Sequence, residues 1–123
     1  LLAFKLNGGL TLPRLDLLNN SIPEQPILQS TEFQISRGTE LYGEYCAFCH
    51  GTAVRAGPAL PDLRMMSNDG HELFKEIVYE GILSENGMSS FSDVLSENDV
   101  MSIYHYIVKT ASVDRQIQLE QNN

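Results

Sequence analysis

The apolar residues after position 30 recur at helical spacing in three stretches of the chain. The first stretch, 31–45, opens with the capping-box pair Thr31 and Gln34 and contains no proline. The second stretch, 68–79, starts with an asparagine and an aspartate that favour helix N-caps, and it is followed by Gly81, a residue type that commonly ends helices. Each of these two stretches is predicted to be a helix.

The third stretch opens at Ser96 and carries apolar side chains at the i, i+3, i+4 and i+7 positions of one helix face. These side chains are Val100, Ile103, Tyr104 and Ile107. The pattern predicts a helix that ends near Thr110 or Ala111. No strand-like alternation appears after residue 30, so the core domain is predicted to be all-α.

The chain has 123 residues, of which 42% are hydrophobic, and this is enough for one core but not for two separate cores. We therefore expect one helical domain over residues 31–111. An extended arm or linker precedes it at 1–30, and a polar C-terminal tail follows it at 112–123. The chain begins at Leu1 rather than at a methionine, which indicates a processed leader or a longer polypeptide upstream.

Sixteen acidic side chains against eight basic ones give a formal charge of -8 at pH 7. Such a charge repels a phosphate backbone, so no nucleic-acid binding is expected. The longest apolar runs are only a few residues long, far short of the ~20 residues that cross a bilayer. No membrane-spanning segment is expected either.

The only two cysteines, Cys46 and Cys49, form a Cys-x-x-Cys-His motif with His50. This motif is the signature of covalent haem attachment. Two thiols three residues apart on a tight helical turn can each form a thioether with one of the two vinyl groups of a haem, and the histidine then lies under the iron. The motif predicts one covalently bound haem c.

Three other uses of the cysteines compete with haem. A structural disulfide would close a very small loop and contribute little to stability. A redox dithiol of the thioredoxin type expects a βαβ unit, and the chain shows no such pattern. A zinc site would need a further ligand from His71, His105 or a carboxylate, and no second closely spaced pair supplies it.

A haem iron bound by His50 needs a ligand on its other face, and methionine takes that place in electron-carrying cytochromes c. Met88 lies in a loop, 81–91, rich in glycine and serine, which can wrap around a haem edge while Phe91 packs on the ring. We therefore predict His50 and Met88 as the iron ligands. The other candidates for the second position are Met65, Met66, Met101, His71 and His105.

From about residue 34 to residue 109 the chain resembles a class I c-type cytochrome. Gly38 and Tyr42 match the family's glycine and aromatic residue on the first helix, where the missing side chain lets the last helix cross closely. Tyr106 matches the aromatic residue that fills the gap. The resemblance implies the class I cytochrome c fold, with three to five helices around one haem.

The resemblance extends to the loops around the haem. The Gly-Pro-Ala-Leu turn containing Pro58 and Leu60 looks like the family's turn in which the proline carbonyl accepts a hydrogen bond from the ring N–H of the haem histidine, here His50. Such a bond fixes the tautomer of the ligand. The Gly-Met-x-x-Phe element around Met88 looks like the methionine-ligand loop, although the family commonly has proline where this chain has Ser89.

A cation, Arg64, follows the Pro58 turn in an otherwise acidic chain. Arginine offers a planar fork that can hold a carboxylate with two hydrogen bonds, so we predict that Arg64 binds a haem propionate. A solvated surface arginine is the alternative, and Arg55 is the other candidate cation.

A closer resemblance covers the ends of the chain as well. Residues 1–9 and the proline-containing segment 13–26 are similar to the last strand and linker that join a β-propeller to its cytochrome domain in quinohaemoprotein alcohol dehydrogenases. Matches at 45–51, 60–64 and 91–96 add to that resemblance. An ordinary extended arm lying on a helical domain is the alternative for the first thirty residues.

In that family a pyrroloquinoline quinone (PQQ) in the propeller oxidises an alcohol and passes single electrons to the haem. The resemblance implies a PQQ-dependent dehydrogenase domain as electron donor, a small redox protein or membrane-bound acceptor, and a periplasmic location. This chain lacks the propeller, so we expect that it does not bind PQQ and that it acts as an electron carrier rather than an enzyme. The alternatives are a free-standing, diffusible periplasmic monohaem cytochrome and a haem-based sensor or ligand-binding module.

Overall fold

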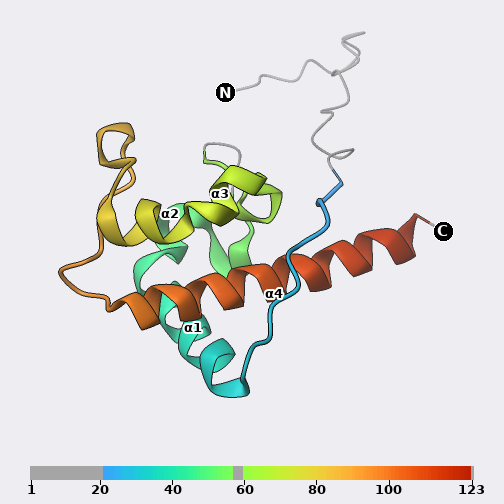
Figure 1. Ribbon diagram of the computed structural model, residues 1–123. Coiled ribbons are helices and arrows are strands. Elements are labelled where there is room, and N and C mark those ends of the chain that lie inside the picture. The colour runs from blue at the N-terminus through green and yellow to red at the C-terminus, as the bar shows by residue number, and fades with distance from the viewer. Residues whose placement is uncertain (1–20, 57–59, 123) are drawn as a thin grey trace, which may run out of the picture.

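A computed structural model of the protein describes residues 21–56 and 60–122 (Figure 1). The described chain is helical and contains no strand, which confirms the prediction of an all-α domain. Its elements in chain order are α1 (Glu32–Tyr45), α2 (Ala47–His50), η2 (Thr52–Val54), η3 (Leu63–Met65), α3 (Asn68–Glu72), η4 (Glu76–Glu80), η5 (Ser84–Asn86) and α4 (Glu97–Gln121).

Helix α1 begins where the capping box predicts and crosses the long helix α4 (Figure 1). The Thr31 hydroxyl accepts the Gln34 N–H at 3.1 Å, while the Gln34 side chain accepts the Thr31 N–H at 3.0 Å. At the crossing, a Cβ on Gly38 would collide with the backbone carbonyl of Ser102. The glycine therefore permits the close approach of α1 and α4 that the sequence indicated.

Next to this crossing the aromatic rings of Tyr42 and Tyr106 lie 5.3 Å apart at an angle of 57°. Both come from the helices that cross, and Tyr42 is almost completely buried. The pair fills the space beside the glycine and joins α1 to α4, as the sequence predicted.

The second predicted helix is broken into two elements. Helix α3 ends at Glu72, and the chain then widens into the π-turn η4 before Gly81, whose left-handed φ of 74° ends the helix. The N-cap is Ser67, whose hydroxyl accepts the Gly70 N–H at 3.2 Å, so the prediction of Asn68 or Asp69 as the cap is wrong. A serine one residue earlier offers the same oxygen acceptor.

Helix α4 starts at the predicted Ser96 cap, which pairs with Asp99 in a second capping box. The prediction that it ends near residue 110 is wrong, because the helix continues to Gln121 and includes most of the expected polar tail. No glycine or proline follows Ala111 to stop it. The extension also has tertiary support, since Asp114 is buried and paired with two arginines.

The described part of the arm, 21–30, has no regular secondary structure, passes across α4 (Figure 1) and contacts this helix at His105 and Gln118. Ile22 is buried, and its N–H donates to the Gln118 side chain at 2.9 Å. The hydroxyl of Ser30 lies 2.6 Å from Nδ1 of His105. This segment is therefore part of the helical body, whereas the strand-like segment predicted at 1–9 lies outside the described residues.

Candidate haem site

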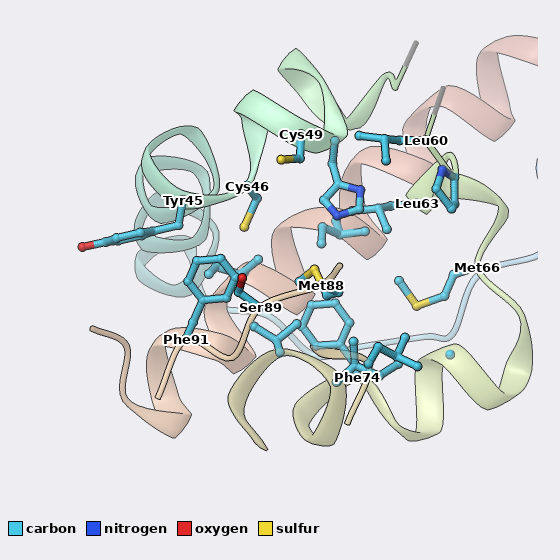
Figure 2. A pocket seen from close by; sticks show the side chains of 18 of the residues that line it. Tyr45, Cys46, Cys49, Leu60, Leu63, Met66, Phe74, Met88, Ser89 and Phe91 are labelled. Atoms are coloured by element: carbon cyan, nitrogen blue, oxygen red, sulfur yellow. The ribbon is translucent and has the colours of Figure 1, made fainter. Parts of the chain in front are cut away.

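The helices surround a cavity of about 510 Å³ whose walls are mainly apolar side chains (Figure 2). Most of the predicted site residues line it, although they come from different segments of the chain. These are Cys46, Cys49, His50, Leu60, Met88 and Phe91. The structure thus brings together the two thiols, the imidazole and the thioether that the sequence singled out.

The Cys-x-x-Cys-His motif forms the short helix α2, which follows α1 almost without interruption. Cys46 ends α1 and starts α2, and its carbonyl accepts the N–H groups of Cys49 at 3.2 Å and His50 at 2.8 Å. Gly51 then turns the chain away with a φ of 86°, and the Tyr42 hydroxyl donates to the Gly51 carbonyl at 2.7 Å. This tight turn places all three motif side chains on one wall of the cavity.

The two thiols are free but differ in environment. Cys46 is buried and Cys49 is exposed. Burial, reinforced by the nearby Cys49 thiol, raises the pKa of the Cys46 thiol to about 11. Redox-active dithiols instead depend on a lowered thiol pKa, so the environment of Cys46 disfavours the thioredoxin-type alternative.

Zinc is disfavoured on different grounds. Across residues 21–56 and 60–122, no group of three or more histidine, cysteine or acidic side chains lies close enough to hold a metal ion. His71 does not approach the cysteines: its Nδ1 lies 3.1 Å from the Tyr104 hydroxyl. His105 is engaged with the arm through Ser30. The further protein ligands that a zinc site requires are therefore not assembled within these segments.

His50 is half-buried, and its environment favours the neutral imidazole. Burial lowers the pKa of His50, and the backbone carbonyl of Pro61 offsets this effect in part. Its Nδ1 is buried and forms no hydrogen bond with the described residues. The neutral form is the one that binds a metal. The predicted partner of this ring, the carbonyl of Pro58, lies outside the described residues.

Met88 lies in the loop between η5 and α4, and Figure 2 shows its side chain inside the cavity. Met66 also lines the cavity, on the segment between η3 and α3, although nothing in the sequence favoured it over Met88. A Cβ on Gly70 would lie 2.6 Å from Cγ of Met66, so Met66 packs tightly over α3. The remaining alternatives, Met65, Met101, His71 and His105, do not line the cavity.

Arg64 is placed beside the cavity rather than in its wall. Its guanidinium lies 2.7 Å from the carboxylate of Asp62 and 2.9 Å from that of Asp114. Arg55, the other candidate cation, lies 3.1 Å from Asp114. Two carboxylates of the protein thus already bind the guanidinium of Arg64. The binding of a haem propionate by Arg64 stays a prediction.

The apolar walls were not recognised as part of the site from the sequence. They include Leu63, Phe74, Val78, Ile103 and Ile107. Two of these residues belong to the helix face that the sequence predicted for α4, and the pattern marked them only as core. Periodicity shows that a face is buried, but it does not distinguish a face that packs on protein from one that faces a cofactor.

The residues present fit a haem. A large, mainly apolar cavity suits a flat porphyrin, while the two thiols, the imidazole and the thioether suit covalent attachment and iron ligation. A family model described as "Cytochrome C oxidase, cbb3-type, subunit III" matches residues 33–107. The chain belongs to this family of c-type cytochromes. It is a cytochrome c domain, which implies haem c as its cofactor and is consistent with a role in electron transfer.

The relatives of this cytochrome domain include large dehydrogenases. Quinohemoprotein alcohol dehydrogenase ADH IIB from Pseudomonas putida is 36% identical over 110 residues, covering 88% of this chain and 16% of the relative. The solved structure of quinohemoprotein alcohol dehydrogenase ADHIIG from Pseudomonas putida HK5 superposes with a TM-score of 0.69 at 36% identity, covering 73% of this chain and 13% of that one. This chain therefore spans only a small part of these dehydrogenases.

A smaller relative is cytochrome c550 from Pseudomonas aeruginosa. It is 30% identical over 80 residues, which cover 62% of this chain and 55% of the relative. The likeness thus extends both to a protein named as a cytochrome and to the dehydrogenases. In the segments that the structure describes, no helix of this cytochrome domain combines the length and the apolar character needed to cross a membrane.

Proposed function

We propose that this cytochrome domain carries one haem c, joined by thioethers to Cys46 and Cys49, with His50 and Met88 as the iron ligands. The observation that supports this proposal is that all four side chains line one apolar cavity. When bound, the haem supplies one-electron exchange between ferrous and ferric iron. Leu60 and Phe91 supply apolar contacts from the cavity wall.

The chain's own residues prepare the site for this role. Cys46 is buried, whereas Cys49 is exposed, and both thiols line the cavity in which the haem would be attached. Burial favours the neutral His50, and the α2 turn keeps it at a fixed distance from both thiols. Apolar walls exclude water, which favours a stable bond from the weak thioether ligand Met88.

We further propose that the electron donor is a PQQ-dependent alcohol dehydrogenase site and that the electrons pass to a small redox protein or a membrane-bound acceptor. The likeness to quinohemoprotein alcohol dehydrogenases over most of this chain supports the donor. PQQ itself binds outside this chain. Because haem c of this type is attached outside the bacterial cytoplasm, the proposed location is the periplasm.

A free-standing diffusible cytochrome is the second candidate. The described arm packs on its own helical body through Ile22 and Ser30, and cytochrome c550 is among the relatives. The reading frame upstream of Leu1 distinguishes the two candidates. A propeller-coding sequence in frame supports the dehydrogenase, whereas a signal sequence directly upstream supports the diffusible carrier.

Mass spectrometry of the denatured protein, expressed with a haem-attachment system, tests the central proposal. The wild-type chain should carry the added mass of one haem. Replacing Cys46 or Cys49 by serine should remove one thioether and much of the holoprotein yield. A denatured chain at its bare mass, with no haem retained, would contradict the proposal.

A haem-based sensor predicts a different absorption spectrum. The oxidised carrier should show a methionine-to-iron charge-transfer band and remain low-spin. A high-spin spectrum with ready carbon monoxide binding would instead favour the sensor, because the sixth position would then be open.

A further inference from the structure

The loop that carries Met88 rests on the π-turn η4. Hydrogen bonds in a π-helix run over five residues, which leaves its last carbonyls free for partners outside the helix. Two of these carbonyls accept hydrogen bonds from the C-terminal end of the loop, at residues 90 and 91. The Phe91 N–H donates to the Val78 carbonyl at 2.9 Å, and the Ser90 hydroxyl donates to the Tyr79 carbonyl at 2.8 Å.

Ser90 also lies directly against the glycine that ends η4. Gly81 is buried, with a left-handed φ of 74°, and a Cβ built on it would lie 2.6 Å from Cβ of Ser90. The serine can reach the Tyr79 carbonyl only because this position has no side chain. The loop thus begins at Gly81, at the end of η4, and Ser90 near the other end of the loop packs against the same glycine.

Contacts of the loop hold Met88 on both sides. The packing and hydrogen bond of Ser90 lie on its C-terminal side, and a backbone hydrogen bond of Met88 itself lies on its N-terminal side. On its N-terminal side, the Met88 N–H donates to the Leu83 carbonyl at 3.2 Å. The segment from Ile82 to Phe91 contains no proline, so no ring restricts its backbone. Its conformation therefore depends on hydrogen bonds, among them the turn bonds of η5. On the C-terminal side of Met88, Ser90 makes the nearest side-chain bond, and its hydroxyl oxygen also lies 3.2 Å from that of Ser92 and accepts the Ser92 N–H at 3.4 Å.

We propose that Ser90 is a positioning residue for Met88, because its hydroxyl bond to the Tyr79 carbonyl holds the loop so that the thioether stays in the cavity. This inference rests on the proposed role of Met88 as an iron ligand. Without the hydroxyl, loop conformations with the thioether outside the cavity become more populated. One hydrogen bond of ordinary net strength corresponds to a change of roughly fivefold in that population.

Imidazole titration of the oxidised holoprotein tests the inference, because imidazole binds the iron only when Met88 has left it. Ser90→Ala should bind imidazole roughly fivefold more tightly than wild type. Ser84→Ala is the matched control: Ser84 lies exposed in the same loop, does not line the cavity, and its hydroxyl forms no hydrogen bond with the described residues. Its imidazole affinity should equal that of wild type.

Two further measurements test the contact from other directions. Gly81→Ala would collide with Ser90 and should also tighten imidazole binding. In holoprotein with Ser90→Ala, hydrogen exchange of the Phe91 N–H should be faster, since the neighbouring anchor is lost. The exchange rate of the Phe91 N–H reports on the loop itself, whereas the imidazole affinity reports on the iron.

The outcomes separate this inference from the proposed function. If wild type shows the methionine-to-iron band, but Ser90→Ala matches Ser84→Ala in imidazole affinity and in Phe91 exchange, the positioning role of Ser90 is wrong and the ligation stands. If wild type lacks the band and binds imidazole as tightly as Met88→Ala does, the ligation is wrong and the inference fails with it.

Discussion

The guanidinium of Arg64 and the carboxylate of Asp114 form an ion pair at 2.9 Å that joins η3 to the second half of α4. The Asp114 side chain is only 9% exposed, and it also pairs with Arg55. The backbone carbonyl of Arg64 accepts a hydrogen bond from the Gln25 side chain at 3.2 Å. This cluster therefore ties the arm, the loop beside the cavity and α4 together.

The first prediction concerns stability and pH. Burial raises the pKa of Asp114, but hydrogen bonds from Arg55 and Arg64 outweigh it and hold this pKa below its ordinary value. A lowered folded-state pKa means that the carboxylate stabilises the fold above its unfolded pKa of about 4, and that this contribution is lost as the pH falls through the folded value.

Asp114→Asn should therefore lower the free energy of unfolding at pH 7 by about 2 kcal/mol, less than for a fully buried pair because the guanidinium of Arg55 is largely solvated. The difference from wild type should shrink as the pH falls below about 4. Denaturant titrations at several pH values measure it. Asp93→Asn, at an exposed position, is the control and should change little, whereas a difference that stayed constant with pH would contradict the electrostatic explanation.

A second prediction concerns Arg64 and the haem propionate. Arg64→Gln should alter the reduction potential and its dependence on pH, because it removes a positive charge beside the cavity. Arg55→Gln is the matched comparison, since Arg55 shares Asp114 but is 61% exposed. If redox titrations at several pH values show no change in Arg64→Gln, Arg64 acts only within the ion-pair cluster.

A third prediction separates the two methionines of the cavity. Met88→Ala should lose the methionine-to-iron band, bind external ligands and lower the reduction potential, because the soft thioether that favours ferrous iron is gone. Met66→Ala should keep the low-spin spectrum, since Met66 serves to pack over Gly70. Absorption spectra of the two oxidised variants decide the question. The reverse pattern would assign the ligand to Met66.

A fourth prediction concerns the surface through which electrons pass. Exposed carboxylates lie within two residues of the cavity lining at Glu44, Glu85 and Asp93. Several basic side chains are already paired with carboxylates, among them Arg37, Arg55, Arg64 and Lys75. Glu44, Glu85 and Asp93 therefore contribute negative charge beside the cavity, in a chain whose formal net charge is -8.

Because opposite charge speeds encounter, the ferrous domain should be oxidised faster by a small cationic oxidant than by an anionic one of equal driving force. Added salt should narrow the difference. Stopped-flow measurements across a salt series test this, and replacing Glu85 and Asp93 by their amides should reduce the preference. Equal rates at low ionic strength would show that the net charge does not steer the partner.

Local sequence chemistry was sufficient for the starts of the first and last helices and for the cofactor motif. The caps at Thr31 and Ser96 need only residues three positions apart, and the α2 turn needs only the five residues from Cys46 to His50. The glycine at position 38 was recognised through a family pattern, and the contact with Ser102 supplies its physical reason. All of these features depend on short-range geometry or on a matched motif.

Tertiary contacts decided the rest. Helix α4 continues past Ala111 because the Asp114 carboxylate pairs with Arg55 and Arg64, which precede it by 59 and 50 residues. Phe74 and Ile107 line the cavity, although Phe74 also packs on the Tyr104 ring of α4 at 4.9 Å, and Met66 reaches that cavity beside Met88. The sequence by itself determined which residues can cap, turn and ligate, since these are properties of neighbours along the chain. Only the folded chain decided which of them meet, because burial and ion pairing depend on segments that are far apart in sequence.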